Sequence, residues 1–119
     1  MSDSRRVLVA DGDAVVRAAL RLLLARNPHF RVVAESENVE ELQRDAGNVE
    51  PDLILLDMDL RGLTPDEMRR TCRAASTIVL STRDEHRQAA LDAGASAFIC
   101  KSESPQQLLS ILQSVAAVA

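Results

Sequence analysis

Acidic residues follow two apolar runs of this sequence, at the points where a strand would end. Asp57 follows the run Leu53–Leu56, with Asp59 two residues later, and Asp11 follows an earlier run. Clustered carboxylates repel one another unless a cation joins them, and oxygen ligands of this kind suit Mg²⁺. An aspartate carboxylate can also act as a nucleophile that accepts a phosphoryl group. Taken alone, each acid is equally compatible with a helix cap or a turn.

A hydroxyl group and an ammonium group end two later apolar runs. Ser81 follows residues 78–80, and Lys101 follows residues 97–100. A serine hydroxyl can donate a hydrogen bond to a phosphoryl oxygen, and lysine supplies a point charge. Taken singly, Ser81 fits a turn and Lys101 fits a solvated strand end. Together with the acids, they favour a site for phosphoryl transfer, which needs little beyond positioning and charge neutralisation.

Five short apolar runs alternate with five helical segments, which is typical of stacked βαβ units. The runs are rich in Val, Ile and Leu, as strands buried on both faces of a parallel sheet require. The expected strands are Arg6–Ala10, Phe30–Ala34, Leu53–Leu56, Ile78–Ser81 and Ala97–Cys100. In such a doubly wound α/β fold the carboxyl ends of the strands border one crevice, where the acids, the serine and the lysine should meet.

The helix boundaries are marked by capping residues. Four residue pairs have the spacing of a capping box: Asn38 with Glu41, Thr64 with Glu67, Thr82 with Glu85, and Ser104 with Gln107. Asp13 is expected to cap the first helix, which should end before Pro28. Gly47 and Gly94 are expected to end helices.

The bulk composition argues against two classes of partner. The 119 residues are 46% hydrophobic, enough for one domain with its own core. The net charge of −4 and the scattered arginines argue against a nucleic-acid surface, so any DNA contact would have to come from another domain. No segment resembles a membrane span or a signal peptide, and we expect a cytoplasmic protein.

The two cysteines and the two histidines show no metal-ligand spacing. Cys72 falls on an expected helix, and Cys100 lies in an apolar run, where we expect a buried thiol. Reduced, cytoplasmic thiols are the better interpretation of this pattern. Because His29 and His86 are isolated in sequence, a zinc site is not expected.

Two of the expected helices are more apolar than one core-facing stripe requires. The first helix and the last helix, after Pro105, carry apolar residues around much of their circumference. Most of these residues should be core, but the excess could form a docking or dimer face. The segment Asp84–Ala93 has only alanines and one leucine to bury, which favours a mobile helix.

The ordered set of strand-end motifs resembles the response-regulator receiver domain of two-component signalling. The matching segments are Val7–Asp11, Leu55–Gly62, Val79–Ser81 and Phe98–Lys101, and the resemblance covers essentially the whole chain. Each motif alone is short, but their order and spacing are specific. The resemblance implies a flavodoxin-like, doubly wound (βα)5 three-layer sandwich with parallel strand order 2-1-3-4-5, and a single receiver domain over residues 1–119.

The resemblance also assigns roles to individual residues. Carried over position by position, Asp57 would be the phosphoacceptor, and Mg²⁺ would be held by Asp11, Asp57 and the backbone carbonyl of Asp59. Ser81 and Lys101 would contact the phosphoryl group. Phe98 would be the switch aromatic that moves with Ser81. The resemblance implies a switch that is not an enzyme, with at most slow autodephosphorylation.

Partners follow from the same resemblance. The phosphoryl donor would be a sensor histidine kinase or a small phosphodonor. A homodimer would form through the first and last helices, or through the face made by the fourth helix, fifth strand and fifth helix. Lys101-Ser102, where many receivers have Lys-Pro, favours the type attached to a helix-turn-helix output domain, so the chain would be a module of a longer protein.

Two departures from the family pattern favour an alternative function. Receivers usually carry two adjacent acids after the first strand, and here the second is Gly12, while Asp13 is better placed to cap a helix. Where the family often has Met-Pro-Gly after the phosphoacceptor, this chain has Leu60-Arg61-Gly62, and Arg61 could offset the missing cation or block the site. The alternative is an atypical receiver that acts as a phosphorylation-independent interaction and dimerisation module.

A third hypothesis is a small phosphatase. Asp57-Met58-Asp59 after an apolar strand resembles the haloacid-dehalogenase motif, in which the first Asp attacks and the second acts as acid–base. The motif comes mid-chain and no terminal acidic pair follows Lys101, which argues against this function.

Overall fold

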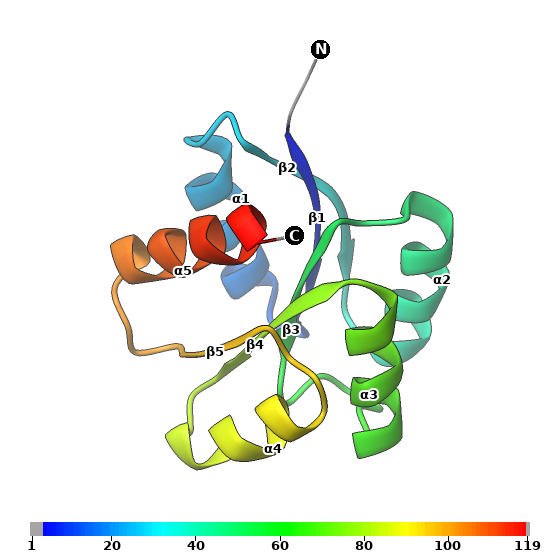
Figure 1. Ribbon diagram of the computed structural model, residues 1–119. Helices are drawn as coiled ribbons and strands as arrows, with labels where there is room; N and C mark the ends of the chain where they lie inside the picture. Colours follow the sequence, from blue (N-terminus) through cyan, green and yellow to red (C-terminus); the bar gives the residue numbers. More distant parts are fainter. Residues whose placement is uncertain (1–3, 119) are drawn as a thin grey trace.

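The computed structural model describes residues 4–118, with only the backbone for Val118. Strands and helices alternate along the chain (Figure 1). Their bounds are β1 Arg5–Ala10, α1 Ala14–Ala25, β2 Phe30–Ser36, α2 Val39–Val49, β3 Leu53–Asp57, α3 Pro65–Ala74, β4 Ser76–Ser81, the 3₁₀ turn η1 Asp84–His86, α4 Arg87–Asp92, β5 Ala97–Cys100 and α5 Pro105–Val118. All five predicted strands are present, most of them longer by one or two residues.

The five strands form one parallel sheet in the order β2-β1-β3-β4-β5. Helices α1 and α5 pack on one face of the sheet, and α2, α3 and α4 pack on the other. The predicted three-layer, flavodoxin-like fold with order 2-1-3-4-5 is therefore confirmed. In the described part of the chain, no helix has the length and apolar character needed to cross a membrane.

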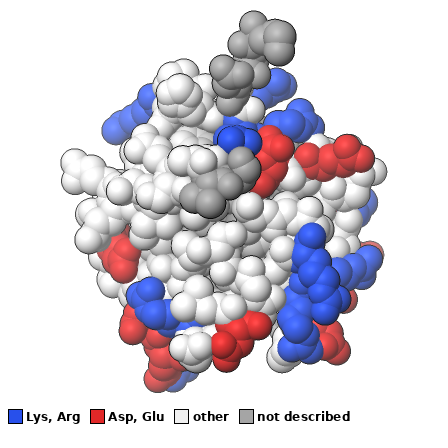
Figure 2. All heavy atoms as spheres, in the orientation of Figure 1, with Lys and Arg blue, Asp and Glu red and all other residues white. Residues whose placement is uncertain are grey.

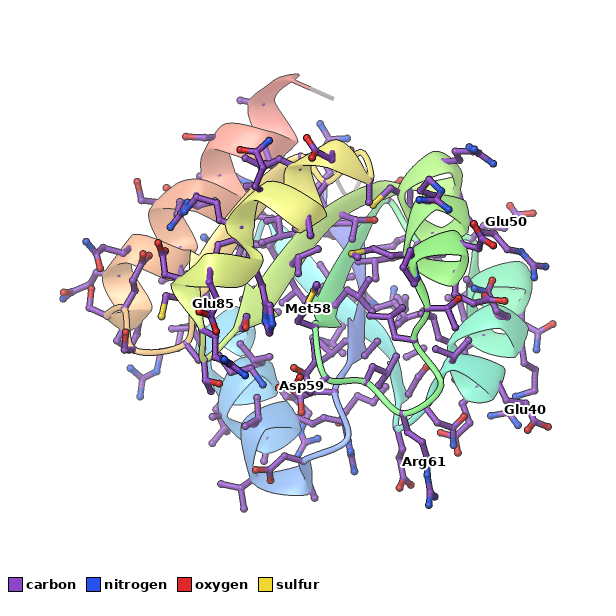
Figure 3. All side chains as sticks on the ribbon, turned by 90° about the horizontal axis from the view of Figure 1, so that it is seen from below. Glu40, Glu50, Met58, Asp59, Arg61 and Glu85 are labelled. Carbon is purple, nitrogen blue, oxygen red and sulfur yellow. The ribbon has the colours of Figure 1, made fainter. Side chains whose placement is uncertain are left out.

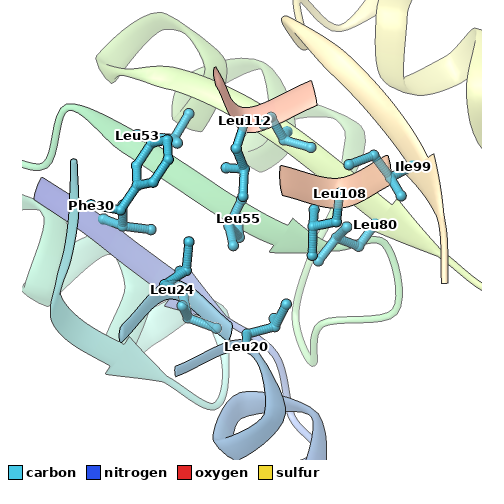
Figure 4. Close-up of a cluster of buried hydrophobic side chains, with 12 residues drawn as sticks. Leu20, Leu24, Phe30, Leu53, Leu55, Leu80, Ile99, Leu108 and Leu112 are labelled. Carbon is cyan, nitrogen blue, oxygen red and sulfur yellow. The ribbon is translucent and has the colours of Figure 1, made fainter. Parts of the chain in front are cut away.

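Side chains that alternate along the strands fill two cores. In β3, Leu53 and Leu55 face α1 and α5, while Ile54 and Leu56 face α2, α3 and α4. All four are buried, because both faces of the sheet are covered by helices. Figure 4 shows the first core, where Leu108 and Leu112 of α5 meet the sheet. The double burial of β3 accounts for its uninterrupted apolar sequence.

Most of the predicted caps form. Asp13 Oδ1 accepts a hydrogen bond from Val15 N at 2.8 Å and so caps α1. Asn38 and Thr64 accept from the backbone N–H three residues later, at 2.8 and 3.1 Å. Ser104 forms the complete box, because the Gln107 amide oxygen in turn accepts from Ser104 N at 3.2 Å.

Gly47 does not end a helix, contrary to the prediction. Helix α2 continues to Val49, because Ala46 and Val49 both pack against the second core and extend its apolar side past the glycine. The helix ends instead at Glu50, which takes a left-handed conformation with φ of 47°. Gly94 does follow the end of α4, with φ of 105°.

The predicted cap at Thr82 is also wrong. The chain enters η1 at Arg83 with no side-chain cap, and α4 has six residues instead of the expected helix over Asp84–Ala93. Ala90 is the one residue of α4 that is fully buried, so little apolar contact supports a longer regular helix. Arg83 N instead donates to the Ser81 hydroxyl at 3.0 Å.

Candidate functional site

The predicted site residues meet at the carboxyl edge of the sheet. Asp11 follows β1, Asp57 ends β3, Ser81 ends β4 and Lys101 follows β5. These four strands are neighbours in the sheet, so their carboxyl ends lie along one edge of it. Met58 and Asp59 lie beside it on the loop after β3, near the middle of the molecule when it is viewed from below (Figure 3).

Lys101 joins the two acids. Its Nζ lies 2.9 Å from Asp11 Oδ2 and 3.1 Å from Asp57 Oδ1. The side chains of Asp11 and Asp57 are only 2% and 9% exposed, so the ammonium group offsets part of the charge of two nearly buried carboxylates. Lys101 is also the only lysine of the chain. The ammonium is a compact point charge that can contact both acids at once.

Backbone N–H groups hold both carboxylates in place. Asp11 Oδ1 accepts from Asp13 N at 2.9 Å, and Asp57 Oδ1 accepts from Asp59 N at 3.1 Å. Asp57 Oδ2 accepts no hydrogen bond from any residue that the structure describes. One oxygen of Asp57 is therefore held by Asp59 N and Lys101, and the other has no hydrogen-bond donor among the described residues.

The electrostatics of the site favour a further cation. Burial raises the pKa of Asp57 above its ordinary value, and so does the charge of Asp11, although the hydrogen bond from Asp59 N and the charge of Lys101 lower it. For Lys101, burial lowers the pKa, but its hydrogen bond to Asp11 and the charges of both acids outweigh burial and raise it. The Lys101 ammonium group therefore stays charged, but it supplies one positive charge beside two carboxylates, which leaves a negative charge for a further cation to offset.

The donor set fits Mg²⁺ that keeps most of its water ligands. Within residues 4–118 there is no group of three or more His, Cys, Asp or Glu side chains arranged for a metal. Mg²⁺ needs only one or two carboxylates, which Asp11 and Asp57 supply, and the backbone carbonyl of Asp59 lies on the adjacent loop. The residues present therefore fit a Mg²⁺ site that has two carboxylate ligands and in which water supplies most of the others.

Gly12 is not required by the backbone. A Cβ added there would lie 3.5 Å from the backbone oxygen of Glu37, an ordinary contact, and Gly12 is not among the residues with positive φ. The neighbouring Asp13 is committed to capping α1. The missing second acid is thus a feature of the sequence and not a steric necessity.

Ser81 has a partner that sequence reasoning missed. Its side chain is fully buried, and its Oγ lies 2.8 Å from Nδ1 of His86, on the turn after β4. The five-residue spacing between Ser81 and His86 carries no recognised motif, so only the short 3₁₀ turn η1 brings them together. The backbone of Ser81 also accepts from Lys101 N at 2.7 Å, which ties the ends of β4 and β5.

Phe98 lies in the middle of β5 and is 4% exposed. It packs in the second core, beneath Arg87 of α4. The Arg87 guanidinium carbon lies 4.8 Å from the centroid of the Phe98 ring, within the range of a cation–π contact. Arg87 is a second residue that the sequence did not single out.

Two expectations about neighbouring side chains are not met. Arg61 is exposed and points away from Met58 and Asp59 in Figure 3, and it forms no hydrogen bond or ion pair with the acids. Its backbone instead joins Asn38 in an isolated bridge. Cys100 is partly exposed and not buried, with its Sγ 3.1 Å from Ser102 Oγ, because it sits at the last position of β5. Cys72 lies on α3 as predicted, and both thiols are free.

Comparisons with known proteins agree with this geometry. The response regulator receiver domain family matches residues 7–113. The nitrate/nitrite response regulator protein NarL of Escherichia coli K12 is 31% identical over 117 residues, covering 93% of this chain and 54% of NarL. The transcriptional regulatory protein YdfI of Bacillus subtilis is 30% identical over 108 residues, covering 87% of this chain and 51% of YdfI.

A solved structure has the same fold. The two-component response regulator of the LuxR family from Aurantimonas sp. SI85-9A1 aligns with a TM-score of 0.88 and 26% identity, covering 97% of this chain and 86% of that chain. The chain spans about half the length of NarL and YdfI. By its sequence and by its fold, this chain belongs to the receiver domain family of two-component response regulators.

Proposed function

We propose that this domain is a phosphorylation-controlled switch that accepts a phosphoryl group on Asp57. The observation that carries the proposal is the pairing of Asp57 with Lys101, which holds Oδ1 and leaves Oδ2 without a donor among the described residues. Asp11, Asp57 and the backbone carbonyl of Asp59 would hold Mg²⁺. The donor would be a sensor histidine kinase or a small phosphodonor, and the domain itself would not be an enzyme.

The reaction forms one bond and breaks one. Asp57 Oδ2 attacks the phosphorus atom, and the bond from phosphorus to the donor breaks, with the electron pair leaving on the donor atom. Bound Mg²⁺ would neutralise charge on the phosphoryl oxygens. Lys101, already 3.1 Å from Asp57, would turn to a phosphoryl oxygen as a point charge. Ser81 would donate its hydroxyl proton to another phosphoryl oxygen.

The switch would then reach the surface through Phe98. As Ser81 moves toward the phosphoryl group, Phe98 follows it and changes the face made by α4, β5 and α5. That face would control an output domain or a partner. Since YdfI is named a transcriptional regulatory protein, we extend the proposal to control of transcription through a DNA-binding domain elsewhere in a longer protein.

A second surface suits self-association. Helix α5 carries no charged residue over 105–118, and Figure 2 shows few charges over it. Next to it, Val15 and Leu22 of α1 are 76% and 65% exposed and line a groove of about 450 Å³ with Leu108. We propose α1 and α5 as one dimer face, with the face made by α4, β5 and α5 as the alternative. Sedimentation of a Leu22→Glu variant distinguishes the two, because only the first loses the dimer.

The test is incubation with acetyl phosphate and Mg²⁺, read on a phosphate-affinity gel. Wild type should show a shifted band that is lost in Asp57→Ala. The matched control is Asp59→Asn, whose side chain is exposed and whose backbone carbonyl is unchanged, and it should keep the shift. If wild type shows no Asp57-dependent band, the proposal is wrong. Hydrolysis of a phosphomonoester that both variants lose would favour the phosphatase instead.

The alternative function is a phosphorylation-independent interaction module. It is favoured by Gly12, which removes one acid, and by Lys101, which already supplies a cation to both remaining acids. A Mg²⁺ titration decides between the two functions. No binding at millimolar Mg²⁺, together with an intact dimer, would favour the interaction module.

A further inference from the structure

Two consecutive residues at the start of α4 contact the two residues assigned to the switch. His86 ends η1 and lies against Ser81, and Arg87 begins α4 and lies over Phe98. We propose that His86 and Arg87 are positioning residues that hold Ser81 and Phe98 in their unphosphorylated places. We call this pair the α4 clamp. The inference rests on the proposed phosphorylation of Asp57 and names how this chain restrains it.

The hydroxyl proton of Ser81 decides which group is the donor in the hydrogen bond with His86. Ser81 Oγ accepts from Arg83 N at 3.0 Å and lies 2.8 Å from His86 Nδ1. Because Ser81 is fully buried, its hydroxyl proton needs an acceptor, and among the hydrogen bonds of the described residues His86 Nδ1 is the acceptor it has. We therefore assign the hydroxyl as the donor and His86 Nδ1 as the acceptor.

That arrangement places His86 in competition with a phosphoryl group. A serine hydroxyl has a single proton to donate. While Ser81 donates to His86, it cannot donate to a phosphoryl oxygen on Asp57. Phosphorylation must therefore break the contact between Ser81 and His86, and loss of His86 should favour the phosphorylated arrangement.

Arg87 restrains Phe98 in the same way. Its guanidinium carbon lies 4.8 Å from the ring centroid, and its Nη1 lies 3.5 Å from the Phe98 carbonyl oxygen. Asp84, one turn earlier, holds Arg87 Nη2 at 2.8 Å and so fixes the guanidinium over the ring. Phe98 cannot leave its buried position without losing this cation–π contact.

The two contacts release together because they share one short element. His86 and Arg87 are adjacent in the chain, and α4 buries only Ala90 completely. A segment with so little buried surface separates from the sheet at low cost. Movement of η1 and the first turn of α4 would free the Ser81 hydroxyl and the Phe98 ring in one step.

The test measures binding of beryllofluoride, a phosphoryl mimic, in the presence of Mg²⁺. The His86→Leu variant should bind it about two- to tenfold more tightly than wild type, since one competing hydrogen bond is lost. The His86→Asn variant should return to wild-type affinity, because its Oδ1 can accept at the place of Nδ1. The Arg87→Met variant should bind about two- to fivefold more tightly. Gln88→Ala is the matched control on α4, because Gln88 is exposed and bonds to Asp92.

An imidazole ¹⁵N spectrum gives a readout that a purely structural role would not move. The chain has two histidines, and exposed His29, beside the amino end of β2, serves as the reference. Nδ1 of His86 should be unprotonated and hydrogen-bonded, and either Ser81→Ala or beryllofluoride should shift it toward the values of His29.

The outcomes separate the clamp from the function beneath it. If wild type binds beryllofluoride through Asp57 and His86→Leu binds it equally well, the clamp is overturned and the proposed function stands. If wild type binds none while its His86 signal still responds to Ser81→Ala, the proposed function is overturned and the clamp loses its role. Tighter binding in His86→Leu with rescue in His86→Asn supports both.

Discussion

Replacing Lys101 by methionine tests whether its ammonium group balances Asp11 and Asp57. The Lys101→Met change keeps most of the side-chain length and removes the charge that lies 2.9 and 3.1 Å from the two acids. It leaves both carboxylates nearly buried and without the ammonium group that contacts them. We expect the free energy of unfolding at neutral pH to fall.

The size of the loss follows from the distances. Both carboxylate oxygens contact one ammonium nitrogen, so they lie no more than about 6 Å apart. At an effective dielectric constant of about 20, two unit charges at about 6 Å repel by about 3 kcal/mol. The lost hydrogen bonds add to this, while protonation of Asp57 relieves part of it. We expect a net loss of about 2–4 kcal/mol in the free energy of unfolding.

Urea unfolding, with and without Mg²⁺, measures this loss. Mg²⁺ should stabilise the Lys101→Met variant more than wild type, because the metal supplies the positive charge that lysine no longer provides. The control is the double variant with Asp57→Asn, which removes one of the two repelling charges. It should recover most of the lost stability, since the two changes act on one interaction.

Two results would refute this reasoning. A Lys101→Met variant as stable as wild type would mean that solvent already screens the two acids from each other. Equal loss in the single and double variants would place the effect in packing around the lysine stem, and not in the charges.

Three further measurements follow from the described residues. Burial raises the pKa of Asp57 above 3.8, so the charged carboxylate destabilises the folded state at neutral pH. Asp57→Asn should therefore be more stable than wild type at pH 7, and this advantage should vanish as the pH falls through the folded pKa toward 3.8. Urea titrations from pH 7 to 3.5 measure the difference. Gly12→Asp should tighten Mg²⁺ binding about tenfold, measured by calorimetry, because the backbone leaves room for a side chain there and the new aspartate adds a carboxylate. Unchanged affinity would mean that the new side chain lies outside the site. Glu50 takes a left-handed conformation with φ of 47° at the end of α2, which glycine adopts without strain. Glu50→Gly should therefore raise the free energy of unfolding by about 1 kcal/mol. A lower free energy of unfolding would show that the glutamate side chain contributes more than its backbone strain costs.

The sequence predicted the sheet, and the meeting of the strand-end residues at its carboxyl edge, because both depend on local patterns. A strand buried on both faces must be apolar throughout, so the end of each run also located the polar residue after it, as with Asp57 and Ser81. The shared edge of a parallel sheet then placed Lys101 beside Asp11, although the two are 90 positions apart. Capping residues such as Thr64 were also legible, because their partners lie three residues away.

The failures came where tertiary contacts outweighed local preference. Gly47 stays helical because the residues on either side of it pack on the core, and no pattern in the sequence weighs that contact against the cost of glycine. The contact between His86 and Ser81 depends on the path of a single 3₁₀ turn, which the expected regular helix would not have followed. Arg61 lies near Asp57 in sequence but faces outward, because its backbone pairs with Asn38.

The long separation between Lys101 and Asp11 also sets an order of events during synthesis. A ribosome makes both acids, and three-fifths of the sheet, well before it makes the lysine that contacts them. Until β5 emerges and pairs with β4, the growing chain holds two carboxylates that oppose closure of the carboxyl edge. The last strand therefore completes the sheet, and the lysine that follows it places a positive charge between the two acids.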